Sequence, residues 1–121
     1  MSSDSSSPAS SSASASVFRV DKFVVPSQSI SAFVDRIHQV QRMLGEQPGC
    51  LQKHVLTQTG DSSEFDVVTV VEWANADAVA AAQAVMQKRL ASEGFDIQAF
   101  RKKLGVRGDS GMYRAACERA S

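Results

Sequence analysis

Three side chains in the sequence have the chemistry of a reactive or ligand-binding site: Asp21, His54 and Trp73. His54 is a candidate general base because the unperturbed pKa of histidine lies near neutrality. A carboxylate on a half-buried strand is costly unless it is paired or its pKa is raised, so Asp21 is a candidate base or ligand anchor. The indole of Trp73 offers a flat surface for an aromatic ligand and one N–H donor.

Each candidate also has a purely structural interpretation. A single histidine on a strand is commonly a structural or exposed residue, and Asp21 could pair with Arg19 or Arg114. Trp73 could fill the core beneath a helix. Gln41 falls inside the apolar stripe of a predicted helix, where its amide would hydrogen-bond either a ligand or a backbone carbonyl at the end of the sheet.

The residues around these candidates predict an alternation of strands and helices. The strand segments are rich in β-branched and aromatic residues, and Pro26 ends the first because proline cannot donate to a ladder. Apolar residues at three- and four-residue steps predict the helices, and Gly45 and Gly105 stand where helix C-caps belong. In chain order we expect strand 17–25, helix 30–44 capped by Ser27 or Ser29, strand 50–58, strand 65–73, a long helix capped by Asn75 or Asp77, a short helix from Asp96 to Leu104, and a last strand near 111–116.

This order predicts an α+β protein with the ferredoxin-like split βαβ fold, an antiparallel sheet with helices on one face. Strand 65–73 has apolar residues at both its odd-numbered and its even-numbered positions. The face that points away from the helices is therefore also apolar, through Val68 and Val70. An apolar rear face requires a partner, and we predict a homodimer in which the two sheet faces pack together.

Composition restricts the class of protein. Residues 1–16 contain ten serines and neither lysine nor arginine, which predicts a disordered Ser/Ala-rich tail before a single domain at 17–121. Thirteen basic residues balance thirteen acidic ones, so the basic footprint of a nucleic-acid-binding protein is missing. Cys50 and Cys117 lack metal-binding spacing and suit a reducing compartment. We expect a cytoplasmic protein with no metal, no nucleic-acid partner and no membrane partner.

The sequence resembles the antibiotic biosynthesis monooxygenase (ABM) domain family, which belongs to the dimeric α+β barrel superfamily. The resemblance covers essentially Val17 to Arg114. It rests on Phe23–Pro26 before the first helix, Gln47–Gly49 before the second strand and Val71–Trp73 at the end of the third strand. The family includes oxygenases that form quinones from anthrones or hydroquinones without flavin or metal, haem-degrading enzymes and a signal-molecule isomerase. The fold therefore does not determine the function.

The residues match the quinone-forming branch better than the haem-degrading branch. The haem-degrading branch relies on an Asn, a Trp and a His at positions where this sequence has Asp21, Ala82 and Ser92. The quinone-forming branch uses a Trp at the end of the third strand, which Trp73 matches. Its polar partners are often Asn, whereas this sequence has Asp21 and Thr69 at those positions.

The resemblance implies a cofactor-independent monooxygenase that oxidises a small aromatic or quinol substrate, polyketide-like in kind, with dioxygen. Such chemistry requires a base, an electrostatic partner for the developing anion and a dry pocket. We expect no cofactor, with Trp73 positioning the ring and His54 or Asp21 taking the proton. The other residues expected to bind substrate are Phe23, Cys50, Thr69, Val79 and Met86.

Strict alternation along strand 50–58 places Cys50, Gln52, His54 and Leu56 on one face, and the resemblance makes this the pocket side. Two other functions remain open. A non-catalytic domain that binds a small ligand or serves as an accessory protein would explain the missing Asn. An isomerase acting on a small carbonyl compound would need His54 and Asp21 close together across the sheet.

Overall fold

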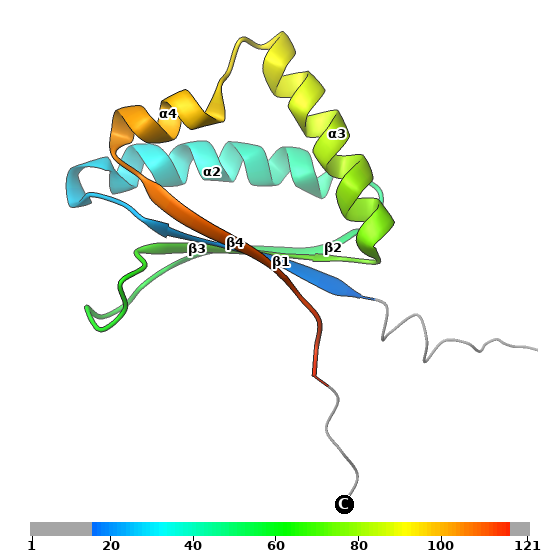
Figure 1. The fold of residues 1–121 in the computed structure, drawn as a ribbon, viewed down its shortest axis with the longest axis horizontal. Coiled ribbons are helices and arrows are strands. Elements are labelled where there is room, and N and C mark those ends of the chain that lie inside the picture. The colour runs from blue at the N-terminus through cyan, green and yellow to red at the C-terminus, as the bar shows by residue number, and fades with distance from the viewer. Residues whose placement is uncertain (1–15, 117–121) are drawn as a thin grey trace, which may run out of the picture.

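The computed structural model describes residues 16–116, which form a four-stranded antiparallel sheet with helices on one face (Figure 1). The strands lie in the spatial order β2-β3-β1-β4. Their bounds are Val17–Val24 for β1, Cys50–Thr57 for β2, Val67–Trp73 for β3 and Arg107–Tyr113 for β4. The helical elements are the short 3₁₀ helix η1 at Ser27–Ser29 and the α-helices α2 at Ile30–Gly45, α3 at Ala76–Ser92 and α4 at Ile97–Leu104.

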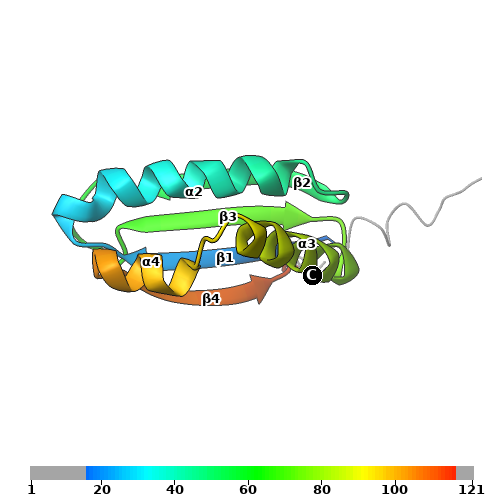
Figure 2. The same cartoon turned by 90° about the horizontal axis from the view of Figure 1, so that it is seen from above.

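This architecture is the α+β ferredoxin-like fold that the element order predicts. Seen from above, α2 runs along the β2 and β3 side of the sheet, whereas α4 and α3 lie over opposite ends of β1 and β4 (Figure 2). Within residues 16–116, none of the helices has the length and apolar character needed to cross a lipid bilayer. The predicted tail, residues 1–16, lies outside the described residues except for Ser16.

The helix ends follow capping residues that are visible in the sequence. The side chain of Asn75, one of the two predicted caps, accepts a hydrogen bond from a first-turn backbone N–H and begins α3. Asp96 caps α4 in the same way, and Gly105 ends it in the left-handed conformation, with φ of 75°. Ser29 occupies the N-cap position of α2, but its hydroxyl donates instead to the carbonyl of Leu104 at 3.0 Å.

The last strand begins earlier than the sequence predicts. β4 starts at Arg107 rather than near Gly111 and ends at Tyr113 rather than near residue 116. Its first half is rich in glycine, aspartate and serine, which have low strand propensity. Continuous antiparallel pairing with β1 supplies the ladder hydrogen bonds and overrides that low propensity.

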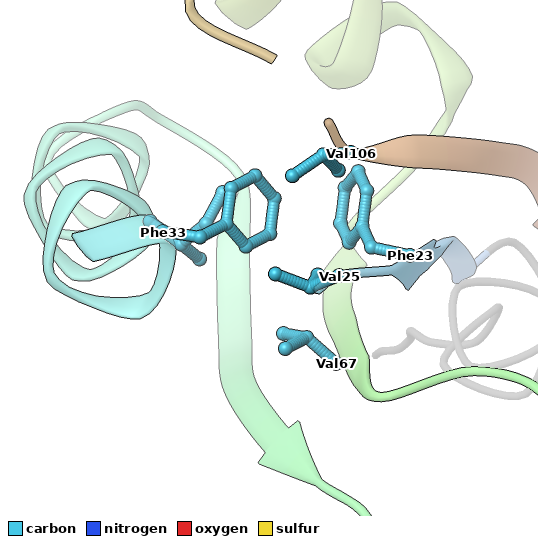
Figure 3. Close-up of a cluster of buried hydrophobic side chains, with 6 residues drawn as sticks. Phe23, Val25, Phe33, Val67 and Val106 are labelled. Atoms are coloured by element: carbon cyan, nitrogen blue, oxygen red, sulfur yellow. The ribbon is translucent and has the colours of Figure 1, made fainter. Parts of the chain in front are cut away.

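The core between sheet and helices is divided into two clusters. Cluster one consists of Phe23, Val25, Phe33, Ile37, Val67 and Val106 (Figure 3). Cluster two consists of Val17, Val71, Trp73, Val79 and Ala82. Because Val17 and Phe23 lie near opposite ends of β1, the clusters occupy opposite ends of the sheet. The residues between them form the centre of its helix-facing side.

A bulge in β2 changes which of its residues face the helices. Cys50 lies opposite Trp73 and Gln52 lies opposite Glu72, so Leu51 is an extra residue without a partner on β3. Beyond the bulge, the alternation of faces is shifted by one residue. The prediction of strict alternation along this strand is therefore wrong.

Candidate functional site

The centre of the helix-facing side of the sheet is polar. Asp21 of β1 lies opposite Thr69 of β3 and opposite Ser110 of β4, so the three side chains form one row across the sheet. Arg19 lies on the same face, two residues before Asp21. We call Arg19, Asp21, Thr69 and Ser110 the polar band. It separates cluster one from cluster two.

The Asp21 carboxylate is the centre of hydrogen bonding in the polar band. Ser110 Oγ donates to Asp21 Oδ1, and Arg19 Nη2 and Nε lie 3.3 and 3.4 Å from the same oxygen. The predicted pairing of Asp21 with Arg19 is therefore confirmed. The side chains of Asp21 and Arg19 are 19% and 32% exposed, so solvent reaches the pair. All three of these contacts use Oδ1.

The helices leave Arg19 and Asp21 of the polar band partly exposed, whereas Thr69 is buried. α3 covers cluster two through Val79, and α4 packs Phe100 and Leu104 against cluster one. Met112, opposite Arg19 on the helix-facing side of β4, remains 48% exposed. Figure 2 shows β1 and β4 in view between α4 and α3. The partial exposure of Arg19 and Asp21 agrees with this arrangement of the helices.

Gln41 is a polar residue in the helix layer that faces the sheet. On α2 it follows Ile37 of cluster one by one turn and precedes Leu44, which packs against cluster two. It is 5% exposed, and its Oε1 has no hydrogen-bond partner in the part of the chain that the structure describes. Helical periodicity in the sequence predicts that Gln41 is buried. It does not predict that the Oε1 atom of Gln41 lacks a hydrogen-bond partner.

Trp73 faces the helices, as predicted, and is 2% exposed. Its neighbours in cluster two are Val17, Val71, Val79 and Ala82. A surface cavity of about 420 Å³ lies at the opposite end of α3, with a lining drawn from the segment 87–97, and Trp73 does not line it. The packing supports the core interpretation of Trp73, and its role in catalysis stays a prediction.

The other residues predicted to bind substrate are spread over the helix-facing layer. Phe23 belongs to cluster one, Val79 to cluster two and Thr69 to the polar band. Met86 is buried on α3. The fold brings these residues to one side of the sheet, but it distributes them between packed clusters and the polar centre.

Cys50, also predicted to bind substrate, lies opposite Trp73 and packs against cluster two. Burial raises the pKa of its thiol, while the positive charge of Lys53 lowers this pKa in part. A thiol with a raised pKa is protonated at neutral pH, so Cys50 contributes a small apolar surface rather than a nucleophile.

His54 lies on the face of the sheet that points away from the helices. It is exposed and lies opposite Val70, on the other face from the buried residues of β3. The prediction that His54 shares a face with Cys50 is wrong, because the bulge at Leu51 inserts one residue between them. Within one chain, His54 and Asp21 lie on opposite faces, which favours Asp21 as the base. The catalytic role of His54 stays a prediction.

Arg19 and Ser110 belong to the polar band but are absent from the site residues that the sequence predicts. Strand alternation relates Arg19 to Asp21, so that signal is present in the sequence. Ser110 precedes the predicted start of the last strand and carries no comparable signal. Among residues 16–116, no group of three or more His, Cys, Asp or Glu side chains is arranged to hold a metal ion.

Solved structures share this fold at low sequence identity. A suspected monooxygenase from Shewanella loihica has a TM-score of 0.69 and 18% identity, over 86% of this chain and 97% of its own. SnoaB, a cofactor-independent oxygenase from Streptomyces nogalater, has a TM-score of 0.61 and 21% identity, over 85% and 95% of the two chains. A heme-degrading protein from Mycobacterium tuberculosis has a TM-score of 0.53 and 13% identity, over 88% and 97%. At these identities, the similarities establish the fold and not the reaction.

Sequence comparison identifies the family. No curated protein matches the chain. The family model for antibiotic biosynthesis monooxygenase matches residues 16–87, which is more than half of the chain. The chain therefore belongs to the antibiotic biosynthesis monooxygenase family.

Proposed function

We propose that this protein is a cofactor-independent monooxygenase that oxidises a small aromatic or quinol substrate, of the polyketide kind, with dioxygen. The observation that carries the proposal is the polar band, where a partly exposed carboxylate and a guanidinium lie between two apolar clusters. Family membership and the shared fold with a cofactor-independent oxygenase support the same reaction class.

In this proposal, Asp21 removes a proton from the activated methylene group of an anthrone-type substrate, and Arg19 stabilises the anion. The anion transfers one electron to dioxygen, and the two radicals combine through a new carbon–oxygen bond. The O–O bond then breaks. One oxygen atom remains as the new carbonyl of the quinone, and the other leaves as water with the two methylene hydrogens. Dioxygen is the oxidant, so the step needs no further electron donor.

The test is oxygen uptake and quinone formation by metal-free protein with an anthrone substrate, after subtraction of a protein-free blank for autoxidation. Asp21→Asn should lower kcat/KM by about a hundredfold or more, the usual contribution of a general base. Asp109→Asn is the matched control, because Asp109 is an exposed carboxylate on β4 opposite Lys22. His54→Ala tests the alternative base. Absence of uptake, or a large loss in His54→Ala with none in Asp21→Asn, would overturn the assignment.

We also propose that two copies of the chain associate through the sheet face that points away from the helices. On this face Phe18, Val20 and Val70 are half-buried, while Leu56 and Tyr113 are 49% and 52% exposed. A second copy would cover these apolar side chains. Sedimentation should detect a dimer that Val70→Lys dissociates, whereas Val85→Lys, at an exposed position on α3, should leave it intact. A monomeric wild-type protein would exclude this association.

The packing of Trp73 favours a second candidate function, a non-catalytic domain that binds a small ligand. Trp73 lies in a filled cluster, and the cavity at the end of α3 does not reach it. In that case, the protein would bind aromatic ligands without oxygen uptake, and Asp21→Asn would change affinity only. The same oxygen-uptake assay, combined with a binding measurement, distinguishes the two functions.

A further inference from the structure

Gln41 breaks the apolar stripe with which α2 covers the sheet. The stripe otherwise presents Phe33 and Ile37 to cluster one and Leu44 to the side of cluster two. Gln41 is as buried as its apolar neighbours, at 5% exposure, and falls between the positions that serve the two clusters. Along the strands, the polar band occupies the corresponding interval between the same two clusters. Its member on the β2 and β3 side, along which α2 runs, is Thr69 (Figure 2).

The carbonyl oxygen of Gln41 is a buried acceptor without a donor. Oε1 has no hydrogen-bond partner among residues 16–116. Most buried polar atoms in folded proteins have a partner, and one without it destabilises the fold relative to an apolar side chain of similar size. A leucine or methionine would suit both the helix and the surrounding clusters better. The stability of the free protein therefore does not explain a glutamine at this position.

We infer that Gln41 is a specificity-determining residue that accepts a hydrogen bond from a hydroxyl group of the bound ligand. The inference rests on the proposed function, in which one ionisable group of an aromatic substrate meets Asp21 and Arg19 on the sheet. Gln41 belongs to α2, on the β2 and β3 side of the sheet, and in this inference it meets a different edge of the ligand. The ligand class is therefore an aromatic compound with at least two hydroxyl groups on different edges of its ring system.

Such a site discriminates strongly against analogues that lack the second hydroxyl, because the amide oxygen then stays buried without a partner. The preference is a property of binding and does not require dioxygen. It can therefore be measured without air on the full-length protein. This separates the role of Gln41 from the oxidation itself.

The experiment compares a naphthalenediol with hydroxyls on opposite rings against a naphthol with one hydroxyl. Dissociation constants are measured by fluorescence under nitrogen for the wild-type protein and for Gln41→Leu. The wild-type protein should bind the diol on the order of tenfold more tightly than the naphthol. Gln41→Leu should bind both about equally. Gln39→Leu is the matched control, because Gln39 is an exposed glutamine on the same helix and should retain the wild-type preference.

The melting temperature provides an independent measurement. Removal of a buried acceptor without a partner should raise the Tm of Gln41→Leu by about 4–8 °C in a domain of this size. Gln39→Leu should shift it little. A rise in Tm with loss of the diol preference supports the inference. A fall in Tm, a preference that survives in Gln41→Leu, or no binding of either compound to the wild-type protein would overturn it. If the diol preference is present without oxygen uptake, the role of Gln41 stands and the proposed oxidation fails.

Discussion

Substitution of Trp73 tests whether the last residue of β3 packs the core or lines a ligand cavity. Its side chain is 2% exposed and belongs to cluster two. Truncation of a large aromatic residue in a packed core costs about 3–5 kcal/mol of unfolding free energy, and the loss is smaller where space already surrounds the ring. We expect Trp73→Ala to lower the unfolding free energy by about 3–5 kcal/mol and Trp73→Phe by roughly 1–2 kcal/mol.

The assay is urea unfolding followed by circular dichroism, with free energies extrapolated to water. Phe33→Ala, at 1% exposure in cluster one, should cost as much as Trp73→Ala, whereas Ile97→Ala, at 37% exposure, should cost about 1 kcal/mol or less. Small domains have about 5–15 kcal/mol of stability, so Trp73→Phe keeps the comparison measurable if Trp73→Ala fails to fold. A loss below about 1 kcal/mol in Trp73→Ala, with Phe33→Ala as expected, would refute the packing argument.

The α3 cap and the Cys50 thiol give two further predictions. Asn75→Ala removes the 2.8 Å hydrogen bond from the Ala78 backbone N–H to Asn75 Oδ1 and should cost about 1 kcal/mol in the urea assay, whereas Asn75→Asp retains an acceptor and should cost little. In a Cys117→Ser background, the pH midpoint for alkylation of Cys50 by iodoacetamide should lie above that of a free thiol. Burial raises the pKa of Cys50, so less thiolate is present at a given pH. Lys53→Met should raise the midpoint further, since Lys53 lowers this pKa; a midpoint below that of free cysteine would contradict the burial argument.

The sequence by itself determines most of the elements and their ends. Apolar residues at helical spacing predict α2, and the side chains of Asn75 and Asp96 begin the next two helices. Gly105 ends α4 because it adopts a positive φ without a steric penalty. These signals are local, since each cap acts within one turn of its own helix. The family resemblance and the α+β fold follow from the same patterns and are confirmed.

Only the tertiary structure determines the faces and partners of the polar residues. One extra residue at Leu51 moves His54 to the face away from the helices, although the strand itself is predicted correctly. Ser110 reaches Asp21 across 89 residues of sequence, because β4 pairs with β1 from an earlier start than its composition indicates. The missing partner of Gln41 depends on what packs around α2. Strand register and side-chain packing depend on contacts between segments that are distant in the chain, and residue spacing within one segment does not encode them.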